Sequence, residues 1–417
     1  MRTATLVAIG DELLSGIRRE GNCTYLARLL HDAGWKTLHM EVIPDELPQI
    51  EEVLERWIGK TDILVLSGGL GPTHDDKTRF ALAEYLGCSL AVDNALYDRV
   101  SARYEGSPLR STVESSRSIQ GLVPMAAEGV YNPAGSALGI YFEKKGTRVW
   151  SFPGVPFEYK AMATQELTPL LSSNPGTWTW KSVSIADVPE SVAALEIHEI
   201  VADSRLHISI LPSFGLVEIV VRGERELVGS AVREIHSKFP ENALPDGCST
   251  LPEAILTVGR EKSLTLSCAE SCTGGALGAS LTDLPGISDV FMGSAVVYNN
   301  EAKIKLLGVE QSVLEAHGAV SKECAESMAK GALQLYGTSL SAAVTGIAGP
   351  GGGSAEKPVG TVWFAIASQV GNKTECTSFT RRLSGERGPV RERAVRVALS
   401  SVWRKMEEMP SHTPGFP

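Results

Sequence analysis

The chain has 417 residues, of which 43% are hydrophobic and 21% charged, and a formal net charge of −10. Its length allows two or three domains with their own hydrophobic cores. The negative charge argues against direct binding of nucleic acid, because phosphate contacts need a concentrated basic surface. Seven scattered cysteines argue against a disulfide framework. No apolar run is long enough to span a membrane and the first residues predict a strand instead of a signal peptide, so we expect a cytoplasmic protein.

Strand and helix patterns alternate from residue 1 to about residue 171. The hydrophobic pattern predicts strands at residues 4–9, 37–43 and 62–66, and helices at residues 23–33, 47–58 and 78–86. Such alternation is typical of an α/β fold with a doubly wound parallel or mixed sheet, in which helices cover both faces. In these folds ligands bind at the carboxyl ends of the strands.

A glycine-rich loop follows the third strand and reads Gly68-Gly69-Leu70-Gly71-Pro72-Thr73-His74-Asp75-Asp76-Lys77-Thr78. Glycines allow backbone N–H groups to approach a phosphate, and a carboxylate can hold a divalent metal that bridges that phosphate. Asp75 and Asp76 could equally well cap the helix that follows. The residues alone leave both interpretations open.

The composition changes between residues 173 and 248. Residues 173–176 predict a linker, and the pattern after them predicts an amphipathic helix at 189–201, strands at 207–211 and 217–222, and a helix at 227–239. This is a small α+β domain without a catalytic constellation. Residues 242–249 predict a second linker.

Residues 263–279 predict a strand, a tight turn and a helix. Ser271, Cys272 and Thr273 stand just before two glycines, and helical spacing resumes after them. At such a junction the free N–H groups of the helix face a hydroxyl or an anion, so Ser271 is well placed to be a nucleophile. Ser271 and Thr273 could instead only cap the helix.

The next junction of a strand and a helix carries Tyr298 and Lys303. Asn299 and Asn300 are good N-caps for a helix at residues 301–307. A lysine in the first turn of a helix is disfavoured as a cation, and burial lowers its pKa further. Lys303 could therefore be neutral and take a proton from Ser271, and Tyr298 could orient or relay that proton.

Two further segments can bind anions. A strand at residues 343–345 opens into a glycine-rich loop, 346–354, whose N–H groups could hold an oxyanion or a phosphate. Arg387 stands just before a basic helix predicted at residues 390–403, and Arg391 stands in its first turn; the basic face of such a helix is either solvated or binds phosphate. Residues 406–417, which contain three prolines, predict a disordered tail.

These C-terminal segments resemble the CinA family of competence/damage-inducible proteins. The matching segments are residues 270–275 (E-S-C-T-G-G), 298–303 (Y-N-N-E-A-K), 317–321 (H-G-A-V-S), 346–350 (G-I-A-G-P) and 357–362 (K-P-V-G-T-V). The resemblance implies a nicotinamide mononucleotide deamidase in which Ser271 is the nucleophile, assisted by Tyr298 and Lys303, with no cofactor. The expected substrate contacts are Thr273, Gly274, Gly275, Thr345, Gly346, Ala348, Gly349, Arg387 and Arg391, with the two arginines on the phosphate.

The loop at residues 68–78 is similar to the G-G-x-G-P-T-x-D-D-x-T motif of the N-terminal CinA domain, which is related to molybdopterin-binding proteins. Glu20 stands where the family usually has an aspartate. The resemblance implies a metal-dependent ADP-ribose pyrophosphatase that uses Mg²⁺, Mn²⁺ or Co²⁺, with Asp76 and Glu12 as metal ligands and Asp76 also as a possible base. The expected substrate contacts are Gly10, Glu12, Gly68, Gly69, Gly71, Thr73, Asp75, Asn132 and Gly135.

The sequence thus predicts four regions: a molybdopterin-binding-like pyrophosphatase domain (1–172), a small α+β connecting domain (173–248), an α/β amidase domain (249–405) and a tail (406–417). We expect the ligands to be the two small nucleotides, with neither nucleic acid nor a membrane as partner, and the resemblance implies a homodimer. The alternative is a non-catalytic nucleotide-binding regulator that acts in competence or in the response to DNA damage.

Overall fold

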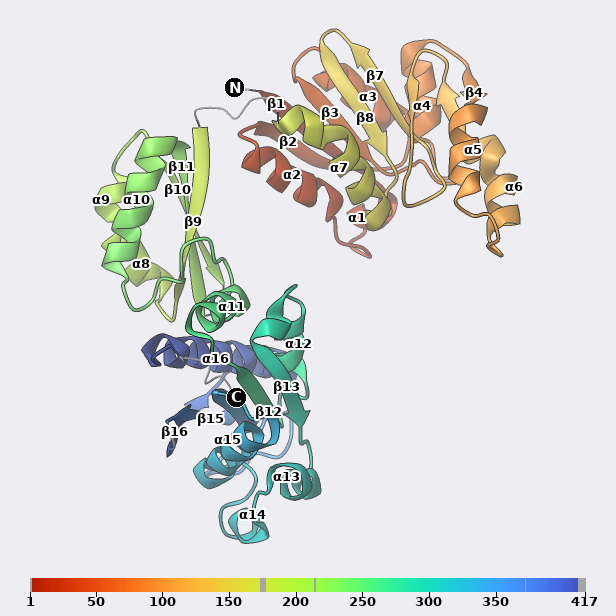
Figure 1. Ribbon diagram of the computed structural model, residues 1–417. Helices are drawn as coiled ribbons and strands as arrows, with labels where there is room; N and C mark the ends of the chain where they lie inside the picture. Colours follow the sequence, from red (N-terminus) through yellow and green to blue (C-terminus); the bar gives the residue numbers. More distant parts are fainter. Residues whose placement is uncertain (1, 173–177, 214, 372, 412–417) are drawn as a thin grey trace. The chain divides into compact units, whose positions relative to one another are not determined.

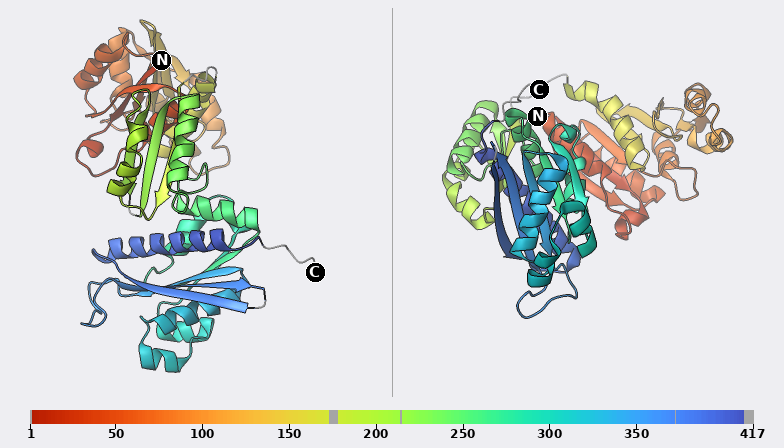
Figure 2. Two further views of the ribbon diagram at one scale, coloured as in Figure 1. Left: turned by 90° about the vertical axis from the view of Figure 1, so that its left-hand side faces the viewer. Right: turned by 60° about the horizontal axis from the view of Figure 1, so that its bottom comes forward.

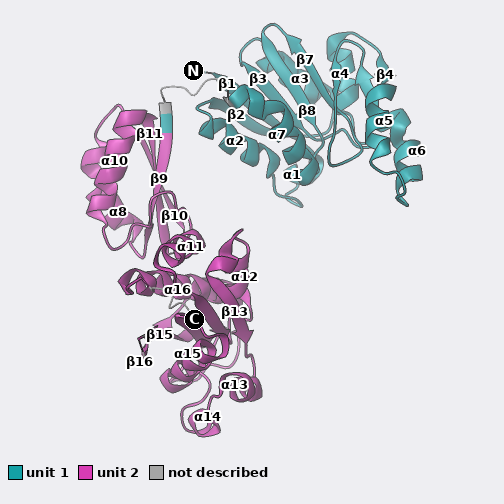
Figure 3. Ribbon diagram, viewed as in Figure 1, with its two compact units in different colours: residues 1–179 teal, residues 180–417 magenta. Residues whose placement is uncertain are grey.

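The computed structural model describes residues 2–172, 178–213, 215–371 and 373–411. The chain divides into a first unit over residues 1–179 and a second unit over residues 180–417 (Figure 3). The linker predicted at residues 173–176 and the last part of the predicted tail, 412–417, lie outside the described residues. The division into a connecting domain and an amidase domain stays a prediction.

The first unit is built on a six-stranded mixed sheet. The strand order is β2-β1-β3-β8-β7-β6; β2, β1, β3 and β8 are parallel, whereas β7 is antiparallel to both neighbours (Figure 1). The strands are β1 (Thr3–Ile9), β2 (Lys36–Ile43), β3 (Ile63–Ser67), β6 (Glu128–Val130), β7 (Gly139–Lys144) and β8 (Thr147–Phe152). β3 is buried at every position, as a central parallel strand requires.

Helices cover both faces of this sheet, so the predicted doubly wound fold is confirmed. One core lies under α2 (Asn22–Asp32) and α7 (Pro156–Ser172), and a second core lies under α3 (Leu47–Trp57) and α4 (Thr78–Leu86). The short helix α1 (Asp11–Leu14) follows β1 directly. A small hairpin-like addition comprises β4 (Leu90–Val92), α5 (Asn94–Ala102), α6 (Arg110–Gln120) and β5 (Leu122–Pro124).

The second unit begins with a three-stranded sheet in the order β10-β11-β9. Its elements are β9 (Trp178–Ala186), α8 (Glu190–Glu196), α9 (His198–Val201), β10 (His207–Ser213), β11 (Leu216–Glu224) and α10 (Arg225–Lys238). The single helix predicted at residues 189–201 is wrong. Ile197 is fully buried and leaves helical geometry (φ −101°, ψ 8°), which divides the segment into two short helices. β9 was not predicted from its pattern.

The C-terminal sheet has the order β13-β12-β14-β15-β16. β13, β12 and β14 are parallel, and β15 and β16 are added antiparallel. The strands are β12 (Leu266–Glu270), β13 (Phe291–Val296), β14 (Leu340–Gly346), β15 (Thr361–Val370) and β16 (Lys373–Arg382). Both faces of β12 are buried, because its side chains enter two different cores.

Two layers of helices enclose this sheet (Figure 2). One layer contains α11 (Leu251–Lys262), α12 (Ala276–Thr282) and α16 (Arg387–Glu408), and the other contains α13 (Asn300–Leu307) and α15 (Lys322–Tyr336), with α14 (Gln311–His317) beside it. A short 3-10 turn, η1, spans Ile287–Asp289.

The last helix is longer than predicted. α16 continues to Glu408, and Met406 and Met409 are buried in the core, so the predicted tail cannot begin at residue 406. The apolar spacing of these two methionines extends the buried face of the helix by one more turn. Among the described residues, no helix has both the length and the apolar character needed to cross a membrane.

Candidate active site

Three parallel strands of the C-terminal sheet bring the predicted catalytic segments to one edge. Ser271 follows β12, Tyr298 follows β13, and Thr345 lies at the end of β14. β12 lies between the other two strands, so the three carboxyl ends are neighbours. This edge is the place where α/β folds bind ligands.

Ser271 and Lys303 are in direct contact. Lys303 Nζ donates to Ser271 Oγ at 3.1 Å and to the carbonyl oxygen of Val297 at 2.8 Å. Lys303 is 1% exposed and Ser271 is 8% exposed. Burial lowers the pKa of the Lys303 ammonium, because a charged amine loses hydration there. The geometry thus pairs a hydroxyl with an amine that gives up its proton more readily than an ordinary lysine.

The thiol beside the serine has the opposite character. Cys272 is 5% exposed, and burial raises the pKa of its thiol to about 11. A thiol with this pKa is protonated at neutral pH and is a weak nucleophile. The hydrogen bond of Lys303 also goes to Ser271, so the arrangement favours the serine as the nucleophile.

The turn after Ser271 differs from the expectation. The N–H of Gly275 donates to the carboxylate of Glu270 at 2.9 Å, and the N–H of Gly274 donates to the carbonyl oxygen of Ser271 at 3.1 Å. We expect an oxyanion to be held by N–H groups of the turn at residues 273–275 or of the loop at residues 346–349. Within the turn only the N–H of Thr273 donates to no other described protein group. A carboxylate and a carbonyl from the same segment already occupy the other two N–H groups.

The glycine-rich loop after β14 keeps donors available. Thr345 is 1% exposed, and its hydroxyl donates to the carbonyl oxygen of Ala319 at 2.8 Å, which fixes the end of the strand. Within the described part of the chain, the N–H groups of Ala348 and Gly349 donate to no other protein group. Together with the N–H of Thr273, these N–H groups are candidates for an oxyanion hole.

Two arginines of α16 reach the same edge. Arg387 donates from Nη1 to the carbonyl oxygen of Gly349 at 2.9 Å and from Nη2 to the hydroxyl of Tyr298 at 2.7 Å. Arg391 donates from Nη2 to the carbonyl oxygen of Thr273 at 2.7 Å. The structure therefore brings both arginines to the loops around Ser271, with guanidinium groups that suit a phosphate.

Tyr298 is placed differently from the other predicted catalytic residues. Its side chain is 60% exposed, and the hydroxyl accepts from Arg387. Among the described residues, no hydrogen bond links this hydroxyl to Ser271 or Lys303. Its role in orienting a proton stays a prediction.

In the first unit, Asp76 holds the glycine-rich loop together. Its Oδ1 accepts from the N–H of Gly71 at 2.8 Å, and its Oδ2 accepts from the N–H of Thr73 at 2.9 Å and from the Thr73 hydroxyl. Helix α4 begins after Lys77 and has no side-chain cap. The interpretation of Asp76 as a helix cap is therefore wrong, since the carboxylate binds its own loop.

The sequence analysis missed Asp45 in this loop cluster. Its Oδ1 accepts from the N–H of Lys77 at 3.1 Å. Burial and, after it, the nearby carboxylates of Asp76 and Asp75 raise the pKa of Asp45 to about 6, although the hydrogen bond from the N–H of Lys77 acts in the opposite direction. Asp45 follows β2, so its place at the carboxyl edge of a predicted strand was a signal available in the sequence.

Asn132 and Glu20, two other residues considered for this site, form hydrogen bonds within their own segments. Asn132 is fully buried, donates to Glu158 Oε2 at 2.7 Å, and accepts from the N–H of Gly135 at 2.7 Å, so it ties its own loop. The carboxylate of Glu20 caps α2 by accepting from the N–H of Cys23 at 2.6 Å. No group of three or more His, Cys, Asp or Glu side chains with metal-binding geometry occurs among residues that the structure describes, and no contact there joins Glu12 to Asp76.

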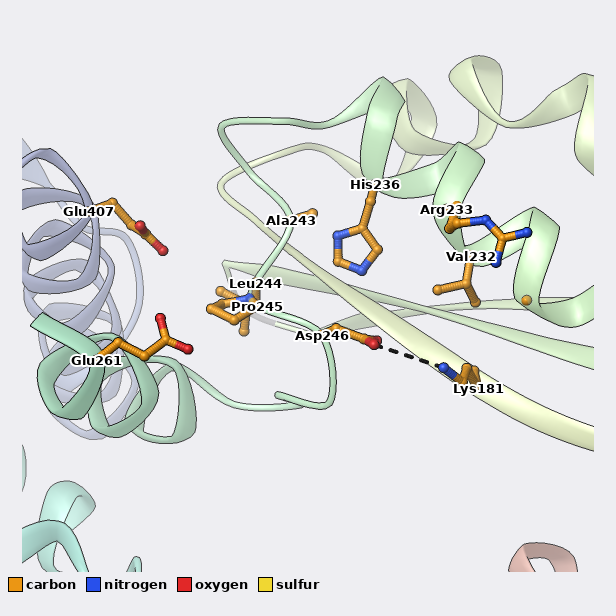
Figure 4. A pocket seen from close by; sticks show the side chains of 11 residues that line it. Lys181, Val232, Arg233, His236, Ala243, Leu244, Pro245, Asp246, Glu261 and Glu407 are labelled. Atoms are coloured by element: carbon orange, nitrogen blue, oxygen red, sulfur yellow. Dashed lines mark ion pairs between the residues drawn. The ribbon is translucent and has the colours of Figure 1, made fainter.

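A charged groove of about 540 Å³ lies elsewhere in the second unit (Figure 4). Lys181, Arg233 and His236 line it on one side, and Glu261 and Glu407 line it on the other. None of the residues predicted for catalysis belongs to its lining. The groove is thus distinct from the edge that carries Ser271.

The chain is similar to known proteins over nearly its full length. A "CinA-like protein" from Fervidobacterium nodosum is 34% identical over 97% of this chain and 98% of its own length, and a "CinA-like protein" from Chlorobium luteolum is 36% identical over 96% of both chains. The chain belongs to the CinA family. Residues 249–406 match the CinA C-terminal domain, and residues 5–173 match the family described as "Probable molybdopterin binding domain".

A solved CinA-type structure covers part of the chain. The competence/damage inducible protein CihA from Agrobacterium tumefaciens is 40% identical, covers 38% of this chain and 95% of its own chain, and has a TM-score of 0.35.

Proposed function

We propose that the second unit is a nicotinamide mononucleotide deamidase, which converts the carboxamide to a carboxylate and releases ammonia. The observation that carries the proposal is the 3.1 Å contact between Lys303 Nζ and Ser271 Oγ, with both side chains buried. A serine next to a lysine of lowered pKa is a known arrangement for nucleophilic attack on an amide.

The reaction balances with these two side chains and water. Ser271 Oγ attacks the carboxamide carbon and its proton passes to Lys303, which gives a tetrahedral intermediate. The C–N bond then breaks, the amine nitrogen takes the proton from Lys303 and ammonia leaves, so that an ester links Ser271 to the nicotinoyl group. Water attacks this ester and gives a proton to Lys303. The bond between Ser271 Oγ and the acyl carbon then breaks, Lys303 returns the proton to Ser271 Oγ, and the acid is released.

Other groups would bind the charges of the substrate. The N–H groups of Ala348 and Gly349 suit the oxyanion, because they donate to no other described group. The guanidinium groups of Arg387 and Arg391 suit the phosphate of a mononucleotide, since both stand at the loops around Ser271. No step of this scheme needs a metal ion.

An ammonia-release assay with purified protein tests the proposal. We expect ammonia and nicotinate mononucleotide in equal amounts from nicotinamide mononucleotide, and no ammonia from the Ser271→Ala protein. If the wild-type protein binds the mononucleotide but releases no ammonia, the unit is a nucleotide-binding regulator and not an enzyme.

For the first unit we propose hydrolysis of the pyrophosphate of ADP-ribose. The approach of Asp75 and Asp76 to Asp45 favours this proposal. Burial and these two carboxylates raise the pKa of Asp45, and a bound cation would offset the repulsion between the negative charges. Asp45 and Asp76 would hold a divalent ion through one or two carboxylate oxygens, and the phosphates of the nucleotide would supply further oxygens. Such an ion would polarise the phosphoryl group. Release of AMP from ADP-ribose with Mg²⁺, Mn²⁺ or Co²⁺ tests this proposal.

A further inference from the structure

Glu270, which directly precedes Ser271, is a fully buried carboxylate with an unusual set of partners. Its Oε2 accepts from the N–H groups of Gly275 at 2.9 Å and Leu277 at 3.0 Å, and its Oε1 accepts from the N–H of Gly278 at 2.8 Å. The hydroxyl of Ser294 on β13 also donates to Oε1 at 2.8 Å. Within the described part of the chain, Glu270 forms no ion pair.

Through these hydrogen bonds the first N–H groups of α12 already have an acceptor within the protein, the carboxylate of Glu270. The first N–H groups of a helix lack partners in the helix and attract an anion. Here Glu270 is that anion, so the start of α12 has no donors left for a substrate oxyanion. The space for it depends on a missing side chain, since a Cβ at Gly278 would lie 3.3 Å from Glu270 Oε1.

The backbone on both sides of Ser271 is also fixed. The carbonyl oxygen of Glu270 accepts from the N–H of Val297 at 2.8 Å, and the N–H of Ser271 donates to the carbonyl oxygen of Val344 at 2.9 Å. Val297 is the same residue whose carbonyl oxygen accepts from Lys303 Nζ. The carboxylate of Glu270 completes this set by tying the turn after Ser271 to α12 and to β13.

We propose that Glu270 is a positioning residue for the deamidation reaction. Its carboxylate holds the turn so that Ser271 Oγ stays in contact with Lys303 Nζ, and it occupies the N–H groups of Gly275, Leu277 and Gly278, so that these donors do not bind the substrate oxyanion. The inference rests on the proposed deamidase function. It assigns to the first residue of the E-S-C-T-G-G segment a task distinct from nucleophilic attack or substrate binding.

The test is the Glu270→Gln variant of the full chain, because glutamine keeps the size but presents an NH₂ group to N–H donors. We expect kcat to fall about 100-fold, as a small displacement of a reacting group commonly does. KM should stay within about threefold, because the groups that bind the nucleotide are unchanged.

Glu253→Gln is the matched control. The carboxylate of Glu253 accepts from the N–H groups of Ser249 at 2.7 Å and Thr250 at 3.0 Å at the start of α11, in a capping box of the same unit. Its loss should lower the melting temperature without lowering kcat. A fall in kcat of the same size in both variants would mean that Glu270 only stabilises the fold and would overturn the proposal, as would a Glu270→Gln enzyme with wild-type kcat.

If the Glu270→Gln protein does not fold, the Ser294→Ala variant tests the proposal instead, because it removes only one hydrogen-bond donor to Glu270. We expect kcat to fall roughly threefold to tenfold with KM unchanged; an unchanged kcat would contradict the inference. If the wild-type protein releases no ammonia, the proposed function fails on its own. The rate at which phenylmethylsulfonyl fluoride labels Ser271, followed by intact mass, then tests the positioning: a rate equal in wild type and variant overturns it.

Discussion

The turn after β12 and the loop after β3 both follow a buried central strand, but they differ in how their charged side chains are buried and paired. In the turn, the carboxylate of Glu270 is fully buried and accepts four hydrogen bonds, and Lys303 is buried against Ser271. At the loop, Asp75 is exposed, Asp76 is partly buried, and Asp45 from the end of β2 is partly buried beside them. Burial raises the pKa of Asp45, and the carboxylates of Asp76 and Asp75 add to that effect.

This difference indicates what each site needs for chemistry. The turn already holds a nucleophile and a base in contact, so it is arranged for proton transfer without an added ion. The loop brings Asp45, Asp75 and Asp76 together, and His74 and Lys77 of the same loop offset only part of their negative charge, so it suits a cation that arrives with phosphate. Four predictions would break or sharpen this contrast.

The largest expected effect is the difference in deamidation rate between variants of the two neighbouring candidate nucleophiles, Ser271 and Cys272. Ser271→Ala should lower deamidation by at least about 1,000-fold, because it removes the group that Lys303 contacts. Cys272→Ala should keep kcat within about threefold, since its thiol is protonated at neutral pH. Steady-state ammonia release measures both. An inactive Cys272→Ala protein together with an active Ser271→Ala protein would reverse the assignment.

The second effect concerns the base. Lys303→Arg should be as inactive as Lys303→Ala, a loss of about 100-fold to 10,000-fold, because a guanidinium does not give up its proton. The pKa of Lys303 is lowered by burial, so the neutral fraction, and with it kcat, should rise with pH through that pKa and fall below it. A pH profile of the wild-type enzyme checks the direction. An active arginine variant would show that position 303 contributes charge and not basicity.

The third effect tests the loop. Asp76→Asn should lower AMP release from ADP-ribose about 100-fold, because the amide loses the charge that a divalent ion needs. Deamidation should be unchanged in this variant and after treatment with a chelator, since the turn uses no metal. Loss of both activities in Asp76→Asn would refute the idea that the two sites work by separate chemistry.

The smallest effect is on stability. Asp45 has its pKa raised from 3.8 to about 6, so between these values the folded chain binds more protons than the unfolded chain, and stability falls as the pH rises through this window. Asp45→Asn removes that cost and should stabilise the first unit by roughly 1 kcal/mol at pH 7.5. At pH 4 the gain should be smaller. Calorimetry at both values, with the exposed Glu46→Gln as control, measures it; a variant that is less stable at pH 7.5 would show that the charge is already neutralised.

Much of the fold and part of the site follow from local patterns. The bounds of α4 were predicted correctly, because apolar residues recur at helical spacing between polar ends. The contact of Ser271 with Lys303 agrees with a prediction from position alone, since both residues follow parallel neighbouring strands.

The remaining features depend on packing between distant segments. Nothing local shows that Glu270 turns back to the start of α12, or that Asp45 lies beside Asp75 and Asp76, which are some thirty positions later in the sequence. The break at Ile197 arises because that side chain enters the core, which outweighs the helical pattern around it.

The end of α16 defines where a shortened chain could stop. Lys262 Nζ, at the end of α11, donates to the carbonyl oxygens of Met406 and Met409, both at 3.1 Å. These carbonyls lie at the C-terminal end of α16, where most backbone carbonyls lack a partner within the helix; the one of Met406 also accepts from the N–H of Met409 at 3.3 Å. A C-terminal truncation that keeps Met409 preserves these acceptors and the buried methionines. A truncation after residue 403 would leave the Lys262 ammonium without these carbonyls and open the core beneath α16, so the usable boundary lies at position 409.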